Sequence, residues 1–468
     1  MGSPTLQLLP ASSLRLLPRF LITALYPFLS TLLNLIPEHA KSHLLKSSGA
    51  QFFLPSVWQQ VDYDVRESLG PHGRFWWQTT GYVLSLLLQD ARYSDGAQQR
   101  ILAFFSRSIA PFLGITNEPG AQRWQSFMTD NHNPIELSWD WHTGNKSPTV
   151  RFSIEPVGPN AGTQVDPDNQ SADALFRNVL AETLPDTSWG WFDHFDRELA
   201  PDLAPKGFME GHPSKIFYAF DLGENDITSK AYFFPGFKAR ATNQTNLQVI
   251  AQAIRTAPLC TDHGRLGAFA MFEEFANDVS TPPLEMDMLA IDMIPAVDSR
   301  LKIYFRNRQT TFASVRQMMT LGNRITTPAL ETGLQNLRRL WDGLLGQSGV
   351  LDDTPLPGGN HRTGGILYNM EFRPGSTTPK IKIYIPARHY APSDWHVVTA
   401  LHEYMHGVNG QSRKPNMPTY ADAFRKVFTY DALQERGLHT YIACSVQSGG
   451  DLRVVSYINA QSEKFAPN

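Results

Sequence analysis

A pair of short β-like segments recurs five times along the chain, and this repeat constrains the fold more than any other feature. The pairs start at residues 135, 215, 286, 366 and 441. Turn-rich stretches such as Arg373-Pro-Gly-Ser-Thr-Thr-Pro join the two segments of a pair, which is typical of β-hairpins. The paired segments are Ile135–Trp141 with Thr149–Pro156, Lys215–Phe220 with Lys230–Phe234, Met286–Met293 with Arg300–Phe305, Ile366–Phe372 with Lys380–Ile385, and Tyr441–Val446 with Leu452–Ile458.

Stretches with helical spacing separate the hairpins. Examples are Thr242–Ala257 followed by Leu266–Asn277, and Trp395–His406 followed by Tyr420–Arg436. A sheet of this many antiparallel strands usually curls or closes, because closure removes its unpaired edges. We therefore predict an α+β protein, a closed barrel of ten antiparallel strands in five ααββ repeats with the helices outside.

Composition supports one large folded unit. The chain has 468 residues, of which 42% are hydrophobic and 11% aromatic, so wholesale disorder is excluded. The net charge of -3 argues against nucleic acid as a partner. Two distant cysteines form neither a disulfide framework nor a cysteine-based metal site, which favours a reducing compartment. Length alone suggests about three domains, but the repeat indicates a single barrel over residues 51–468.

Residues 1–50 form an extension before this barrel. Its segment 20–37 carries no charge and has about the minimum length of a membrane span, although polar residues and Pro27 interrupt it. Three interpretations stay open: a helix on the surface of the protein or a membrane, a short signal anchor, and a cleaved signal peptide. We expect a cytoplasmic protein, with membrane association through residues 20–37 left open.

The second strand of each predicted hairpin carries basic and tyrosine side chains on one face. Side chains alternate between the faces of a strand, and the opposite face is apolar here. In an open sheet the polar face would simply be solvated, but in a closed barrel with outer helices it lines the lumen. The residues on this face are Arg151, Lys230, Tyr232, Arg300, Lys302, Tyr304, Lys382, Tyr384, Arg453 and Tyr457.

Such a lumen suits an allylic diphosphate. Lys and Arg form charge-assisted hydrogen bonds with phosphate oxygens. Tyrosine rings present electron-rich faces that stabilise a cation. Binding of a diphosphate and shielding of a carbocation are the two requirements of allylic transfer, so the pattern predicts a prenyl diphosphate as ligand.

The first hairpin adds a carboxylate to the same face. In Pro134-Ile-Glu-Leu-Ser-Trp-Asp-Trp, the side chains of Glu136, Ser138 and Asp140 share one face and the apolar ones share the other. A buried glutamate can act as general base toward an acidic N–H or O–H. The alternative is a structural salt bridge between Glu136 and an arginine of the lumen.

These segments, in this order and spacing, resemble the fungal dimethylallyltryptophan-synthase-type aromatic prenyltransferases, whose fold is the ABBA barrel. The resemblance covers residues 53–458. It rests on Pro134-Ile-Glu-Leu-Ser, Val150-Arg-Phe-Ser-Ile-Glu-Pro, Lys230-Ala-Tyr-Phe-Phe-Pro, Arg300-Leu-Lys-Ile-Tyr-Phe-Arg, Lys382-Ile-Tyr-Ile-Pro and Ser456-Tyr-Ile.

The resemblance implies a role for each residue of the lumen. Glu136 looks like the residue that activates the acceptor, and Lys230 is a second catalytic candidate that removes the final proton. Lys382 departs from the many tryptophan-specific members that have Gln there. The implied diphosphate site is Arg151, Lys230, Arg300, Lys302 and Lys382, and the implied shield around the allyl cation is Tyr232, Tyr304, Tyr384 and Tyr457.

The predicted function is transfer of a dimethylallyl or longer prenyl group to an electron-rich aromatic acceptor, either an aromatic polyketide or an indole or tryptophan derivative, in fungal secondary metabolism. Metal-dependent prenyl transfer needs Asp-rich motifs that bridge Mg²⁺ to phosphate. The chain has no DDxxD, and Asp352-Asp353 does not continue that pattern. We therefore expect no metal ion and no other cofactor. The expected partners are the two small-molecule substrates, with a homodimer left open.

A zinc metalloprotease is the rival prediction. His402-Glu-Tyr-Met-His406 matches HExxH, which on a helix places two imidazoles one turn apart with Glu403 as base. The longer metzincin pattern fails, because Asn409 stands where its glycine would be. This alternative also leaves the five hairpins unexplained.

Overall fold

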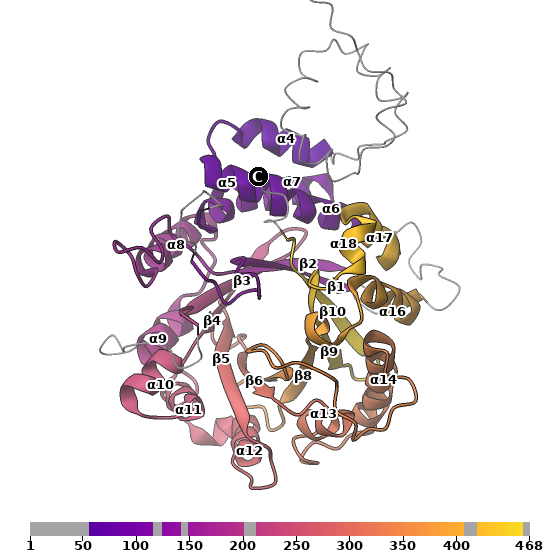
Figure 1. The fold of residues 1–468 in the computed structure, drawn as a ribbon. Helices are drawn as coiled ribbons and strands as arrows, with labels where there is room; N and C mark the ends of the chain where they lie inside the picture. The colour runs from indigo at the N-terminus through magenta and orange to yellow at the C-terminus, as the bar shows by residue number, and fades with distance from the viewer. Residues whose placement is uncertain (1–55, 116–123, 142–147, 201–211, 407–418, 462–468) are drawn as a thin grey trace, which may run out of the picture.

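The computed structural model describes residues 56–115, 124–141, 148–200, 212–406 and 419–461 (Figure 1). The predicted extension 1–50 and its segment 20–37 lie outside these ranges. Among the helices within them, none combines the length and the apolar character that a membrane crossing requires.

The strands pair into a closed cylinder in the order β1-β10-β9-β8-β7-β6-β5-β4-β3-β2, and every pairing is antiparallel. The first and last strands therefore meet and close the barrel, as the repeat predicts. The strands are β1 (Ile135–Trp141), β2 (Thr149–Ile154), β3 (Ile216–Leu222), β4 (Ile227–Phe233), β5 (Leu284–Asp292), β6 (Leu301–Asn307), β7 (Ile366–Phe372), β8 (Lys380–Ile385), β9 (His439–Val446) and β10 (Leu452–Ile458).

Helices surround the barrel on its outside (Figure 1). Two successive helical stretches precede each hairpin, which confirms the ααββ repeat. The longer ones are α4 (Ser56–Val65), α6 (Tyr82–Asp90), α7 (Asp95–Phe104), α8 (Gln170–Thr183), α9 (Gly190–Leu199), α10 (Gly236–Thr242), α11 (Asn246–Thr256), α12 (Gly267–Ala276), α13 (Phe312–Met319), α14 (Pro328–Leu345), α16 (Asp394–His406) and α17 (Tyr420–Val427). Shorter pieces are α5 (Pro71–Trp76), η2 (Trp77–Gly81), η3 (Phe105–Ile109), η4 (Ala110–Phe112), η5 (His263–Leu266), α15 (Ala387–Tyr390) and α18 (Tyr430–Gln434).

The apolar outward face of each strand packs on these helices and forms the main core. Phe152 of β2 is fully buried, and its ring lies 5.7 Å from that of Phe105 in η3 and 5.1 Å from that of Phe220 in β3. Local sequence fixes the ends of the covering helices. In α14, the hydroxyl of Thr327 accepts from the N–H of Leu330 at 3.1 Å, and Gly346 ends the helix at φ 63.

Several element boundaries differ from those expected. The predicted helix Thr242–Ala257 is interrupted at Asn243, whose φ of 54 ends α10, and Thr245 then caps α11 through a capping box. The predicted stretch Tyr420–Arg436 is likewise divided into α17 and α18. Strands β4 and β9 start earlier than expected, but their inward and outward faces are unchanged, because alternation depends on register and not on length.

Candidate active site

The lumen has two ends and a middle zone, and each is lined by a different set of inward-facing residues. We call the end at the hairpin turns the hairpin end; it contains Asp140, Asp221, Asp292 and Glu371. The opposite end, which contains Glu136, Arg306 and Tyr441, is the connection end, where the helical segments join the strands.

At the hairpin end, the predicted cations form ion pairs with carboxylates. Arg151 Nε donates to Asp221 at 2.6 Å and its Nη1 donates to Asp140 at 3.1 Å. Lys230 pairs with the same Asp221. Burial lowers the pKa of Lys230 to about 8, although Asp221 opposes this shift. The structure thus brings Arg151 and Lys230 together, and it holds them by a carboxylate that the sequence analysis did not single out.

The next two cations share a second carboxylate. Arg300 Nε donates to Asp292 Oδ2 at 2.6 Å, and Lys302 Nζ donates to Asp292 Oδ1 at 2.7 Å. Arg300 also reaches Glu371 at 3.1 Å. These cations outweigh the burial of Asp292 and hold its pKa well below its usual range.

The pairing follows the repeat. In the register of neighbouring strands, Arg151 lies opposite Asp221, Lys230 opposite Asp292 and Lys302 opposite Glu371. At the seam between the last and first strands, Arg453 Nε donates to Asp140 at 2.8 Å. The cations on β2, β4, β6 and β10 are thus each matched by an acid on a neighbouring odd-numbered strand.

Lys382 departs from this pattern. Its register partner on β9 is Ser445 instead of an acid, and among the described residues Lys382 makes no ion pair. Its Nζ lies 4.7 Å from the ring centroid of Tyr384 and 5.6 Å from that of Tyr457. Burial, together with the charges of Arg453 and Arg151, lowers the pKa of Lys382 to about 7.

The predicted tyrosines form one continuous row in the middle zone. Ring centroids are 5.7 Å apart between Tyr232 and Tyr304, 5.7 Å between Tyr304 and Tyr384, and 5.6 Å between Tyr384 and Tyr457. The hydroxyls of Tyr304 and Tyr384 are 3.3 Å apart, and Asn369 donates to Tyr384 at 3.0 Å. The row crosses strands β4, β6, β8 and β10, so all of the predicted shield residues lie together.

Small residues on the intervening strands make room for these rings. Ala290 of β5 is the register partner of Tyr232, and Ala443 of β9 is the partner of Tyr384. Both alanines are fully buried. Tyr232 and Tyr384 therefore each face a small residue on an odd-numbered neighbour, whereas Tyr304 lies opposite Met288 and Asn369.

At the connection end, Glu136 is buried and accepts a hydrogen bond from the hydroxyl of Thr440. Burial raises the pKa of Glu136 to about 7, while the Thr440 hydrogen bond and the positive charge of Arg388 act in the opposite direction. Among the described residues Glu136 forms no salt bridge, which disfavours the structural alternative. A carboxyl with this pKa is balanced between acid and base at neutral pH.

Sequence reasoning missed several residues of this site. The acids Asp221, Asp292 and Glu371 were not identified. Arg453 was not assigned to the diphosphate, and Tyr441 was given no role in the site. A recurring signal was present in the sequence. An acidic residue occupies the last inward position of the first strand in four hairpins, and Ser445 occupies it in the fifth.

The metalloprotease prediction is wrong. The rings of His402 and His406 lie 5.1 Å apart on α16 in the outer helical layer. His406 Nε2 accepts a hydrogen bond from the backbone N–H of Tyr420 at 3.2 Å, so this imidazole already has a structural contact. In the part of the chain that the structure describes, the one His-containing group with metal-ligand spacing lies elsewhere, at Asp130, His361 and His389.

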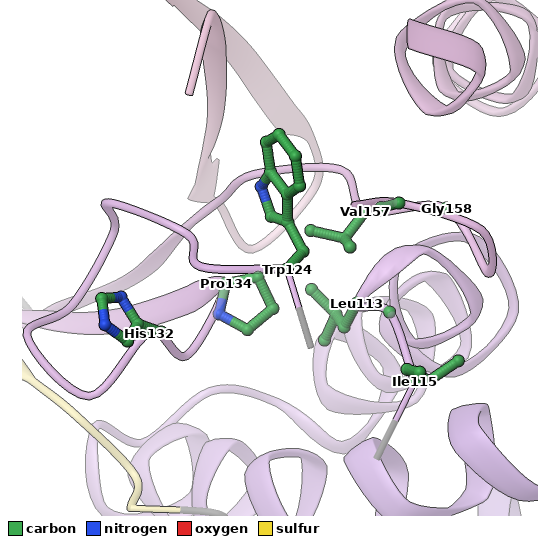
Figure 2. Close-up of a pocket in the computed structure, with 9 residues that line it drawn as sticks. Leu113, Ile115, Trp124, His132, Pro134, Val157 and Gly158 are labelled. Atoms are coloured by element: carbon green, nitrogen blue, oxygen red, sulfur yellow. The ribbon is translucent and has the colours of Figure 1, made fainter. Parts of the chain in front are cut away.

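A second hollow lies outside the lumen (Figure 2). It is lined mainly by apolar residues around Trp124, Leu113 and Val157, and it shares no residue with the predicted site.

Comparison with known proteins identifies the family. Residues 72–418 match the family model described as tryptophan dimethylallyltransferase, which is most of the chain. The chain belongs to this family. It is an aromatic prenyltransferase, an enzyme that transfers a prenyl group from its diphosphate to an aromatic acceptor.

Curated relatives span most of the chain. The 4-O-dimethylallyl-L-tyrosine synthase of Claviceps purpurea is 33% identical over 402 residues, which is 84% of this chain and 89% of the relative. The 7-dimethylallyltryptophan synthase of Aspergillus fumigatus is 30% identical and covers 86% of this chain and 90% of its own. Xanthone prenyltransferase A of Emericella nidulans is also 30% identical, and the match covers 84% of this chain and 93% of the relative.

Solved structures share the fold. AnaPT from Neosartorya fischeri has a TM-score of 0.74 at 24% identity, covering 88% of this chain and all of its own. NotF in complex with brevianamide F and DMSPP has a TM-score of 0.71 at 24% identity, and the match covers 86% of this chain and 98% of NotF. The predicted ABBA barrel is therefore confirmed.

Proposed function

We propose that the lumen binds the prenyl diphosphate with its diphosphate at the hairpin end and the aromatic acceptor at the connection end. One observation carries the proposal. A single lumen contains, from one end to the other, a group of cations, a row of tyrosines and a buried glutamate of raised pKa. In the same order, the reaction involves a diphosphate, an allyl cation and an aromatic acceptor.

The diphosphate site consists of Arg151, Lys230, Arg300, Lys302 and Lys382. All except Lys382 are already fixed by carboxylates, so their positions are set before the substrate arrives. Ionisation breaks the allylic C–O bond and leaves its electron pair on the diphosphate. Preorganised cations stabilise the negative charge that develops there without further reorganisation.

The allyl cation forms beside Tyr232, Tyr304, Tyr384 and Tyr457. Their faces stabilise positive charge, and the continuous row separates the cation from water. A water molecule that reached the cation would give the free prenyl alcohol instead of the prenylated product. The row therefore determines which nucleophile reacts.

Glu136 activates the acceptor. Its carboxylate accepts a proton or a hydrogen bond from the ring N–H or O–H, which makes the ring more electron-rich as it attacks the cation. A new bond to the ring forms, and for attack through carbon the arenium intermediate then loses its ring proton. We assign this removal to Lys230: the bound diphosphate keeps its amine charged, so Lys230 first passes a proton to an oxygen of the released diphosphate and then takes up the ring proton.

No step of this mechanism needs a metal ion, since Lys and Arg supply the positive charge that Mg²⁺ supplies in other prenyltransferases. The acceptor class follows from the relatives. Their names specify tyrosine, tryptophan and xanthone as substrates. We extend this to the present chain as an electron-rich aromatic acceptor from the polyketide or the indole and tryptophan group.

The test is an assay of the full chain with dimethylallyl diphosphate in EDTA, against tryptophan, tyrosine, a hydroxyxanthone and a hydroxynaphthalene. Formation of a prenylated product without metal is expected. Glu136→Ala should lower turnover by about 10²-fold or more, with dimethylallyl diphosphate binding nearly unchanged. Arg316→Met, at an ion pair with Glu331 outside the barrel, is the control. Full turnover by Glu136→Ala would refute the role of Glu136.

A further inference from the structure

At the connection end, a buried guanidinium keeps a donor without an acceptor. Arg388 of α15 has only 7% of its side chain exposed. Its Nη1 is buried, and no described residue accepts a hydrogen bond from it. An unpaired buried N–H is costly, and more so when it is charged, so such a group is expected to have a partner in the working enzyme.

The rest of Arg388 is firmly held. Its Nε pairs with Asp130 at 2.7 Å, and its Nη2 donates to the hydroxyl of Tyr441 at 3.0 Å. The guanidinium carbon also lies 4.5 Å from the ring centroid of Tyr441. Tyr441 packs in the same lumen cluster as Tyr384, and the charge of Arg388 acts on Glu136. These contacts place Arg388 beside the predicted base.

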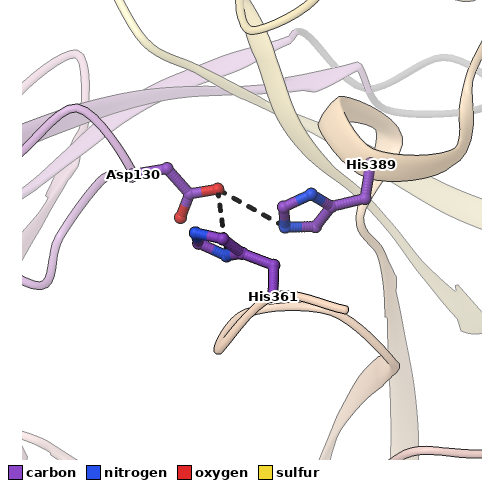
Figure 3. A group of neighbouring side chains, drawn as sticks. All are labelled: Asp130, His361 and His389. Atoms are coloured by element: carbon purple, nitrogen blue, oxygen red, sulfur yellow. Dashed lines mark ion pairs between the residues drawn. The ribbon is translucent and has the colours of Figure 1, made fainter. Parts of the chain in front are cut away.

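Asp130 is in turn held by neighbouring polar side chains. Thr363 donates to its carboxylate at 3.0 Å. His389 and His361 face the same carboxylate (Figure 3), and His389 Nε2 lies 3.4 Å from Asp130 Oδ2. His361 Nδ1 lies 3.8 Å from the same oxygen. This spacing also resembles that of a metal site.

Two contacts favour a hydrogen-bonded role for this group over a metal site. Asp130 Oδ2, the oxygen that faces both imidazoles, already pairs with Arg388, whose positive charge would repel a divalent ion. The Thr363 hydroxyl lies 2.7 Å from His389 Nε2 and 2.8 Å from His361 Nδ1, and so occupies the space between them. The group therefore serves to orient Asp130.

We propose that Arg388 binds an oxygen of the aromatic acceptor through Nη1, and that Asp130 is a positioning residue that holds Arg388 for this contact. Tyr441 contributes to the same contact. Its hydroxyl oxygen accepts from Arg388 and also interacts with Arg306, so its own O–H is directed toward another acceptor. The inference rests on the proposed function, in which the acceptor occupies the connection end.

The acceptor group is an oxygen with lone pairs and partial or full negative charge. A carboxylate and a ring carbonyl both meet this description, and both form strong hydrogen bonds with a guanidinium. Arg388 would hold this oxygen while Glu136 contacts the acidic N–H or O–H of the same molecule. Two contacts on one substrate fix its rotation in the lumen and hence the ring position that meets the allyl cation.

The experiment uses matched acceptors that differ in this oxygen. One pair is tyrosine and tyramine, for the carboxylate. The other pair is a hydroxyxanthone and a hydroxynaphthalene, for the carbonyl. With dimethylallyl diphosphate saturating, kcat and KM are measured for wild type, Arg388→Met, Asp130→Asn and the outer-surface control Arg316→Met. Binding of dimethylallyl diphosphate within about twofold of wild type shows that each variant is folded.

Wild type should prefer the oxygen-bearing member of at least one pair. Arg388→Met should lower kcat/KM for that member by about 10-fold or more, mainly through KM, and for its counterpart by less than about threefold. Asp130→Asn should reduce the same preference by a smaller factor, with kcat nearly unchanged. The pair that shows the effect distinguishes a carboxylate from a carbonyl.

Equal losses for both members of every pair would overturn the assignment of Arg388. A wild-type enzyme that forms product with all four acceptors without preference would also overturn it. A wild-type enzyme that binds dimethylallyl diphosphate but prenylates none of the four contradicts the proposed function, and this inference with it.

Discussion

Binding of the prenyl diphosphate should be accompanied by proton uptake, because two of its proposed ligands are partly neutral in the free enzyme. Burial lowers the pKa of Lys382 to about 7 and that of Lys230 to about 8. A bound diphosphate adds negative charge next to both amines, favours their charged forms and raises both pKa values. At pH 8 the amines therefore take up protons as the ligand binds.

The size of the effect follows from these values. At pH 8, a lysine with a pKa of about 7 is ~0.9 neutral, and one with a pKa of about 8 is ~0.5 neutral. Full protonation in the complex would take up about 1.4 protons, against about 0.1 at pH 6. The sign is fixed as well: since binding consumes protons, affinity for the diphosphate should fall as pH rises above 7.

Calorimetric titration with dimethylallyl diphosphate, without acceptor, measures this uptake when it is repeated in buffers of different ionisation enthalpy. Lys382→Gln should leave only the share of Lys230, ~0.5 proton at pH 8. Ser445→Asp should place an acid opposite Lys382, as Asp221 lies opposite Arg151, and also reduce the uptake. Lys426→Gln, at an ion pair with Asp90 outside the lumen, is the control. The same heat in every buffer at pH 8 would refute the reasoning.

Three further results are expected. Since Glu136 acts as a base and has a pKa of about 7, kcat/KM for the acceptor should rise about fivefold from pH 6 to pH 7, and a flat profile would exclude it as the titrating base. Phe152→Ala should lower the free energy of unfolding by about 3–5 kcal/mol in urea titrations, because it removes a fully buried ring between barrel and helices; a loss below about 1 kcal/mol would contradict the packing. Dialysis against EDTA should change turnover less than about twofold, and recovery of lost activity by Zn²⁺ or Mg²⁺ would disprove metal independence.

Much of the fold could be predicted because one periodic signal repeats. Alternation within each strand identifies the inward face, and five hairpins make closure the favoured arrangement. The residues Arg151, Lys302 and Tyr384 could therefore be placed in the lumen from sequence alone. Boundaries were less accurate, because Asn243 and Thr245 break one predicted helix through local backbone conformation and capping.

The site was predicted less completely because its ion pairs join side chains of different strands. Arg151 and Asp221 are neighbours through register, and register is set by the whole sheet. The group around Arg388 at the connection end was missed for a similar reason. Asp130, Thr363 and Arg388 come from three separate segments, none of which carries a strand alternation, and only folding brings them together.

The closing pair of strands has a consequence for how the enzyme is made. β1 pairs with β10, and two contacts of the site lie across or beside this seam: Arg453 with Asp140, and Thr440 with Glu136, separated by 313 and 304 residues. A chain that leaves the ribosome from its N-terminus has the predicted base long before it has the residue that hydrogen-bonds it. Pairing of such distant segments is slow. A partly synthesised or truncated chain therefore has no enclosed lumen in which a prenyl diphosphate could ionise. Ionisation, which would lead to hydrolysis if water reached the cation, becomes possible only after the barrel has closed.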